Sequence, residues 1–210
     1  MLYIFEPDSK EWIVREMLPG SPLPYAKHSL LSIDSFRSRS TSNLMWTDMR
    51  AIKSLDLLLA LSDTKIVRYA FRRIGEAVHT GQSAHYAGLA FDLGYRLSLK
   101  EQLHLAELAL NCCGFERVEP LGLTPGWLHV EKLIAEPASI KGGYPQLKLG
   151  DRGVHVFVLQ DALLRHEMLS AGITGCFCSA TAFDVRRFQT AFALKPTGKV
   201  NALTWEALMR

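Results

Sequence analysis

The sequence lacks any long hydrophobic run. Its longest apolar stretch, Leu57–Leu61, falls far short of the ~20 apolar residues that a membrane-spanning helix needs. The first residues carry three acidic side chains, Glu6, Asp8 and Glu11, whereas a signal peptide needs a basic start followed by an apolar block. We therefore expect neither a transmembrane helix nor a signal peptide.

The sequence also has little net charge. Its 24 Lys and Arg residues against 21 Asp and Glu residues give +3 in 210 residues, too little to indicate nucleic-acid binding. From Gly142 onward, eight basic and five acidic residues (8 − 5 = +3) carry the whole excess. A weakly basic tail suits an anionic surface, and ordinary scatter of surface charge explains it equally well. With 48% hydrophobic and 21% charged residues, a wholly disordered chain is excluded.

Cysteine is scarce and does not follow a metal-binding spacing. The four cysteines form a vicinal pair, Cys112 and Cys113, and a close pair, Cys176 and Cys178. Neither pair belongs to the two CxxC units of a structural zinc site, and vicinal cysteines bond each other only with strain. We expect reduced thiols.

A chain of this length predicts one or two domains. Two prolines and a Gly-Gly pair interrupt residues 136–145, which is typical of a linker. We predict a front domain at residues 1–135, a linker at 136–145 and a tail domain at 146–210. The fold class we expect is α+β with a small antiparallel sheet for the front domain and an all-α three-helix bundle for the tail.

In the front domain, apolar periodicity predicts a helix over 45–61 and strands over 65–71, 89–93 and 127–131. Ser98 and Glu101 form a capping box that opens a helix running to about Cys112. We place on its buried stripe Leu99, Leu103, Ala106 and Leu110. Residues 1–44 are expected to be mostly irregular.

The tail contains a short internal repeat. Residues 156–163 and 185–192 share the pattern V-x-x-[LF]-Q-x-A-[LF], whose apolar positions lie on one face of a helix. Two equivalent helices are therefore expected, each with a Gln beside its apolar stripe. Asn201 is a good N-cap for a third helix, whose core positions would be Leu203, Trp205 and Leu208.

Residues 147–210 resemble the small three-helix peptidoglycan-binding domain of bacterial wall hydrolases. The resemblance rests on a Leu-Gly-Asp-Arg-Gly run at 149–153, the two Gln-containing helices, Thr197-Gly198 and the Leu-Thr-Trp segment at 203–205. It implies binding to the glycan or stem peptide of the cell wall. Peptidoglycan is thus the expected partner, and the wall the expected place of action.

The front domain contains a His and Asp pattern that indicates a metal site. In the strand over 89–93, Asp92 alternates with apolar residues, and His85 precedes it with Gly88 between them. In the strand over 127–131, alternation places His129 and Glu131 on the polar face. If the strands are neighbours, two imidazoles and one carboxylate converge, which is the ligand set of a catalytic zinc ion with an open position. His129 taken alone would more often be structural.

The combination S-x-H-x-x-G-x-A-x-D at 83–92 and W-x-H-x-E at 127–131 resembles the zinc D-Ala-D-Ala carboxypeptidase and L,D-endopeptidase family, whose metal-site fold is shared with the hedgehog domain. The resemblance implies Zn²⁺ held by His85, Asp92 and His129. Many members carry the catalytic base three residues before the last His, where this chain has Gly126. We assign the base to Glu131, with Glu116 and Glu119 as weaker candidates.

The same resemblance implies an arginine that steadies the substrate, for which we predict Arg72, with Arg68 or Arg73 as substitutes. Ser83 and Trp127 of the two motifs are predicted to bind substrate. The expected function is that of a monomeric, zinc-dependent wall hydrolase cleaving peptidoglycan stem peptides, as a carboxypeptidase or an endopeptidase. A phage endolysin, a spore protein and a trimmed export product all fit. The alternatives are a non-catalytic wall-binding protein with a degenerate peptidase domain and a metal-free interaction module.

Overall fold

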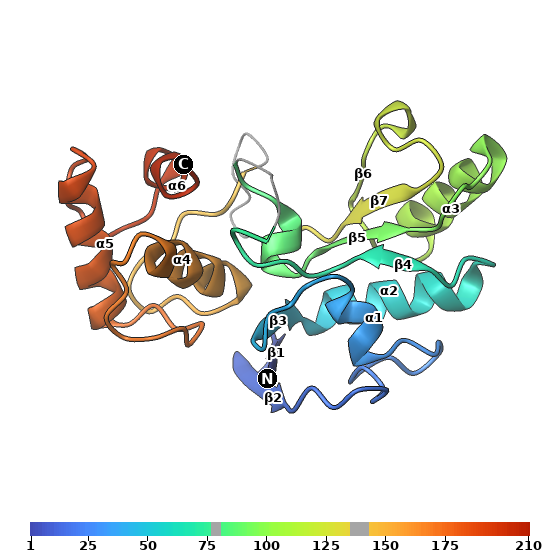
Figure 1. Ribbon diagram of the computed structural model, residues 1–210, viewed down its shortest axis with the longest axis horizontal. Helices are drawn as coiled ribbons and strands as arrows, with labels where there is room; N and C mark the ends of the chain where they lie inside the picture. The colour runs from blue at the N-terminus through green and yellow to red at the C-terminus, as the bar shows by residue number, and fades with distance from the viewer. Residues whose placement is uncertain (77–80, 135–142) are drawn as a thin grey trace. The chain divides into compact units, whose positions relative to one another are not determined.

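The computed structural model of the chain describes residues 1–76, 81–134 and 143–210 (Figure 1). The chain divides into two compact units, Met1–Arg72 with Gly88–Leu133 (unit 1) and Arg73–Ala87 with Ile134–Arg210 (unit 2). Most of the expected linker, residues 136–142, lies outside the described residues. Arg73–Ala87, which the sequence assigns to the front domain, is grouped with the helical unit.

Unit 1 begins with a three-stranded sheet of order β2-β1-β3. Strands β1 (Leu2–Glu6) and β2 (Glu11–Arg15) are antiparallel, and β1 pairs in parallel with β3 (Met45–Asp48). A short helix, α1 (Ile33–Arg37), precedes β3. The expectation that residues 1–44 are mostly irregular misses β1, β2 and α1, which together take up 15 of these 44 residues. Alternation in β1 buries Leu2 and Ile4 completely, which is the pattern of a strand with one covered face.

The predicted helix over 45–61 begins four residues too early. Met45–Asp48 is strand β3, and helix α2 runs from Met49 to Leu61. Asp48 is the N-cap, since its carboxylate accepts a hydrogen bond from the Arg50 amide at 2.8 Å.

The second sheet of unit 1 has the order β4-β5-β7-β6, and every neighbouring pair is antiparallel. Its strands are β4 (Val67–Tyr69), β5 (Ala90–Leu93), β6 (Arg117–Val118) and β7 (Leu128–Glu131). The three predicted strands thus exist, with somewhat shorter limits. One face carries Phe91, Leu93, Leu128 and Val130, all completely buried, so the opposite face is the one available for chemistry.

Helix α3 (Leu99–Asn111) has the predicted capping box and packs against β6, β7 and α2. Its predicted buried stripe is wrong. Leu99, Leu103 and Leu110 are exposed, and α3 buries Gln102, Leu105 and Ala109 instead. Leucine occurs on both sides of this helix, so periodicity alone selects the wrong side.

Unit 2 contains a 3-10 helix, η1 (Ala84–Ala87), and three α-helices, α4 (Val154–Arg165), α5 (Ser179–Ala191) and α6 (Ala202–Leu208). Asn201 caps α6 as predicted, through a 2.9 Å hydrogen bond from the Thr204 amide. Trp205 and Leu208 are buried, but Leu203 is exposed, which corrects its assignment to the core.

The internal repeat has a structural purpose. Gln160 on α4 accepts hydrogen bonds from the amides of Thr174 and Gly175, both at 2.8 Å. Gln189 on α5 accepts one from the amide of Gly198 at 2.9 Å and donates to the carbonyl of Lys199 at 2.8 Å. Each buried glutamine thus fastens the loop that follows its own helix, because the loop's polar backbone groups need partners inside the bundle.

Among the described residues, no helix combines the length and apolar character needed to cross a bilayer. The four cysteines are free thiols, as expected.

Candidate metal centre

The candidate site is built on the polar face of the second sheet. Asp92 on β5 lies opposite His129 on β7 and opposite Tyr69 on β4. Directly opposite residues of an antiparallel pair point to the same face, so the side chains of Asp92 and His129 share the polar face of the sheet. Asp92 and His129 are in direct contact, with 2.8 Å between Oδ1 and Nδ1.

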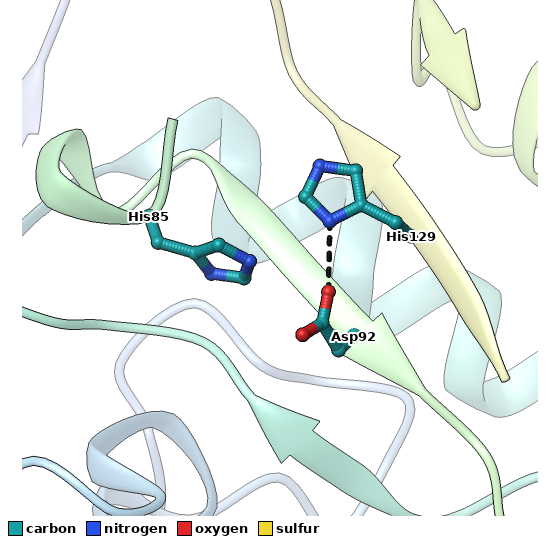
Figure 2. Close-up of side chains that lie close together, drawn as sticks. All are labelled: His85, Asp92 and His129. Atoms are coloured by element: carbon teal, nitrogen blue, oxygen red, sulfur yellow. Dashed lines mark hydrogen bonds and ion pairs between the residues drawn. The ribbon is translucent and has the colours of Figure 1, made fainter. Parts of the chain in front are cut away.

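His85 completes the group, as Figure 2 shows. One ligand atom from each of His85, Asp92 and His129 lies within 4.8 Å of the others. His85 is on η1, its backbone amide donates to the Ser83 hydroxyl at 3.3 Å, and its side chain is buried. The structure therefore brings together the three residues that the sequence selects.

Gly88 links η1 to β5 and has a conformation that requires glycine. Its φ is +66°, and a Cβ at this position would lie 2.2 Å from the carbonyl oxygen of Trp46. The Thr47 hydroxyl donates to the Gly88 carbonyl at 2.7 Å. The end of β3 thus fixes the turn between the first candidate ligand and the strand that carries the second.

His129 lies between two carboxylates. Its Nδ1 faces Asp92, and its Nε2 lies 3.0 Å from Oε1 of Glu131. Burial alone would lower the pKa of His129, but the hydrogen bonds and negative charges of Asp92 and Glu131 outweigh it and raise the pKa to about 9. Without a metal, the imidazole is therefore a cation at neutral pH that holds the two acids together.

Glu131 is the acid that contacts His129 on the same strand. Its Oε1 contacts Nε2 of His129, and its Oε2 forms an ion pair with Nη1 of Arg117 on β6, at a distance of 3.2 Å. Glu116 is engaged elsewhere, because its carboxylate binds the Lys132 ammonium and the Leu133 amide. The backbone amide of Glu119 donates to the His129 carbonyl at 3.1 Å, which places Glu119 beside β7.

Gly126 has a backbone conformation that disfavours a glutamate at this position. Its φ is +78°, a Cβ would lie 3.3 Å from the Arg96 Cα, and its carbonyl accepts from the Leu97 amide at 3.0 Å. A glutamate here would be strained, so the loop before β7 is built for a close approach to Arg96.

The other predicted residues are placed less directly. Arg72 lies with its Cζ 3.9 Å from the ring centroid of Tyr69, the residue opposite Asp92, and its Nε is buried without a hydrogen-bond partner. Trp127 is half-buried, with the Arg68 guanidinium 5.5 Å from its ring. The Ser83 hydroxyl accepts a hydrogen bond from the His85 amide at 3.3 Å.

Two residues that position the site were missed by the sequence reasoning. Gln102 on α3 donates to the carbonyls of Thr124 and Trp127, at 2.7 and 2.6 Å, and so holds the loop that leads into β7. Tyr144 bonds the backbone of Ser83. Gln102 could have been found from the sequence, because a polar residue on the buried face of a helix indicates a hydrogen-bonding role. The sequence gives no such indication for Tyr144, whose partner Ser83 lies 61 residues away.

The donor set fits a zinc ion. Two imidazoles and a carboxylate are zinc's ordinary ligands, and at 2.0–2.2 Å from a tetrahedral ion such donor atoms lie roughly 3.4 Å apart. Atoms already within 4.8 Å of one another need only small side-chain rotations to reach that spacing. His129 would have to lose its proton and give up one of its two carboxylate contacts.

Comparison with known proteins identifies one part of the chain. Residues 152–208 match the family "Putative peptidoglycan binding domain". This peptidoglycan-binding domain contains α4, α5 and α6 and associates the chain with the bacterial cell wall. No curated protein matches the chain significantly. No solved structure does so either.

Proposed function

We propose that the protein is a zinc-dependent peptidase that cleaves the stem peptides of peptidoglycan. The observation that carries the proposal is the convergence of His85, Asp92 and His129 within 4.8 Å, in a chain that also holds a peptidoglycan-binding domain. The resemblance of the two sequence motifs to the zinc carboxypeptidase and endopeptidase family supports the same conclusion.

His85, Asp92 and His129 would hold the ion. A zinc ion in such a site supplies Lewis acidity and lowers the pKa of a bound water to about 7. Glu131 lies two residues after His129 on β7. When the metal is bound, its carboxylate gives up the contact with the imidazole and acts as the general base. Its Oε1 accepts the proton of the attacking water and passes it to the leaving amine.

Two arginines have defined tasks in this scheme. Arg117 holds the second oxygen of Glu131 at 3.2 Å and so orients the carboxylate of the base. Arg72 lies against Tyr69 and supplies a cation for the anionic groups of a stem peptide, since a guanidinium pairs with a carboxylate in two parallel hydrogen bonds.

A second candidate function is non-catalytic wall binding. It is favoured by the ion-pair cluster of Asp92, His129 and Glu131, which satisfies all three groups without a metal. In that case the front unit keeps the motif as a structural charge cluster, and the peptidoglycan-binding domain performs the function.

Metal content and cleavage of purified sacculi separate the two functions. The peptidase should hold one zinc ion and release defined muropeptides, whose masses identify the bond that is cut. His129→Ala should lose the zinc, while His104→Ala, a change at an exposed position of α3, should keep it. Binding to sacculi with no zinc and no released peptide would establish the non-catalytic alternative.

A further inference from the structure

Unit 2 carries both the peptidoglycan-binding domain and the candidate ligand His85. Within unit 2, η1 at the end of the segment Arg73–Ala87 packs against α4. A ligand to a metal must be held in place by its surroundings, because a loosely held ligand pays its ordering entropy when the metal binds. The contacts that hold His85 therefore matter for metal binding.

The closest of these contacts comes from Tyr144. Its hydroxyl accepts a hydrogen bond from the Ser83 amide at 3.0 Å and donates one to the Ser83 carbonyl at 2.6 Å. Both backbone groups of one residue are thus bound by one hydroxyl. The Ser83 side chain in turn accepts from the His85 amide, so the chain of hydrogen bonds runs from Tyr144 to the backbone of the ligand.

Tyr144 is itself held rigidly. The residue is buried, and its ring lies edge-on to Trp205 with 4.9 Å between centroids and to His155 with 5.3 Å. Its backbone amide also donates to the side chain of Gln82. Trp205 on α6 donates its indole N–H to the carbonyl of Pro145 at 2.7 Å. Because Pro145 directly follows Tyr144, this bond holds the backbone beside Tyr144 against α6.

A second contact holds the start of the same segment. Asp161 on α4 accepts from Nε of Arg73 at 3.0 Å and from the Ile74 amide at 3.1 Å. Asp161 is buried, so this ion pair is a fixed part of the helical unit. The helical unit thus bonds this segment at two places, at Arg73 and Ile74 through Asp161 and at Ser83 through Tyr144.

We propose that Tyr144 is a positioning residue for His85, which orders the Ser83–His85 turn before a metal arrives. The inference rests on the proposed zinc site and goes beyond it, because it assigns a part of the metal affinity to the helical unit. Zinc binding then depends on a hydroxyl that is bonded to the backbone of Ser83, two residues before the ligand His85.

The test measures zinc affinity by competition with a chromogenic chelator, in the full chain. Tyr144→Phe keeps the ring contacts with Trp205 and His155, so it should fold and bind sacculi as the wild type does. Its zinc affinity should fall about 10-fold, the low end of the effect of removing an outer support of a metal ligand. Tyr95→Phe, at an exposed ring, is the matched control and should not change the affinity.

The outcomes are distinct. If the wild type binds no zinc, the proposed function fails; if it binds zinc and Tyr144→Phe binds equally well, the positioning role is wrong. Should Tyr144→Phe fold poorly, amide exchange in the zinc-free wild type decides. Protection of the Ser83 amide supports the inference, and exchange at the rate of an unstructured peptide overturns it.

Discussion

Gly88 lies so close to Trp46 that a Cβ on Gly88 would be 2.2 Å from the Trp46 carbonyl oxygen. The same glycine has φ +66°, so two independent restraints act on one position. The contact joins the turn after His85 to the end of the parallel strand β3. The small residue in the His and Asp motif is therefore explained by backbone packing rather than by the chemistry of the site.

Gly88→Ala should lower the free energy of unfolding by about 2–5 kcal/mol. About 1–2 kcal/mol comes from placing a Cβ in the left-handed region, and about 1–3 kcal/mol from forcing the backbone away from Trp46. Gly20→Ala is the matched control, because Gly20 has φ +75° and no atom within 4 Å of its Cβ position. It should show only the first cost. Equal losses in urea unfolding for the two variants would contradict the close approach.

The strands and the site could be predicted because their signals are local. Alternation around Asp92 and His129 predicts a buried and a polar face within each strand, and the structure confirms the pairing of the strands. The burial of β7 alternates as predicted, whereas all four residues of β5 are buried. The capping box of α3 is equally local. Features that depend on a few neighbouring residues, such as strand alternation and helix capping, can therefore be predicted from the sequence.

The failures have a common physical origin in long-range contacts. Strand β3 exists because Met45–Asp48 pairs with β1, more than 40 positions earlier, while its own sequence continues the apolar pattern of α2. In α3, Gln102 binds the Thr124 and Trp127 carbonyls. These bonds turn the side of the helix that carries Gln102 toward the interior, and the leucines on the other side are therefore exposed. The attachment of Arg73–Ala87 to the helical unit likewise depends on Tyr144 and Asp161, which are distant in sequence.

The two repeat glutamines should differ in their contribution to stability. Gln160→Leu leaves the amides of Thr174 and Gly175 without their acceptor, whereas Gln189→Leu leaves only the amide of Gly198 without one. At about 1–3 kcal/mol for each unsatisfied group, the expected losses are about 2–6 and about 1–3 kcal/mol. Gln146→Leu, at an exposed position, should change stability little. A larger loss for Gln189→Leu than for Gln160→Leu in urea unfolding would contradict the prediction that stability follows the number of amides left without an acceptor.

Asp56 should make stability depend on acid. Its burial raises the pKa, but hydrogen bonds from the Ser29 hydroxyl and from the amides of Lys27, His28 and Ser29 outweigh this and lower it. A folded pKa below the unfolded value of about 3.9 means that the stabilisation is complete above that value. It is lost as the pH falls through the folded pKa.

Asp56→Asn therefore should cost at least about 2 kcal/mol at pH 7, since hydrogen bonds to a charged group contribute about 1.5–3 kcal/mol. The difference between wild type and variant should stay constant from pH 8 to 5 and shrink below pH 4. Urea unfolding across this range measures it, with Asp63→Asn at an exposed position as the control. A difference that grows on acidification would reverse the sign and reject the assignment.

Glu131→Gln separates the peptidase from the wall-binding alternative. Glutamine keeps the size of Glu131 and can still bond to His129, but it cannot accept a proton. The variant should keep its zinc and its thermal stability and lose at least about 100-fold in turnover of stem peptides, the low end for removal of a general base. Glu116→Gln is the matched control, because the Glu116 carboxylate binds Lys132 and the Leu133 amide instead, and it should cleave at the wild-type rate.

Wild-type turnover by Glu131→Gln would move the search to Glu119, which lies beside His129 across the β6–β7 pair. Loss of zinc in Glu131→Gln would instead make Glu131 a ligand, and its 3.0 Å contact with the His129 imidazole would then mark a second carboxylate at the metal.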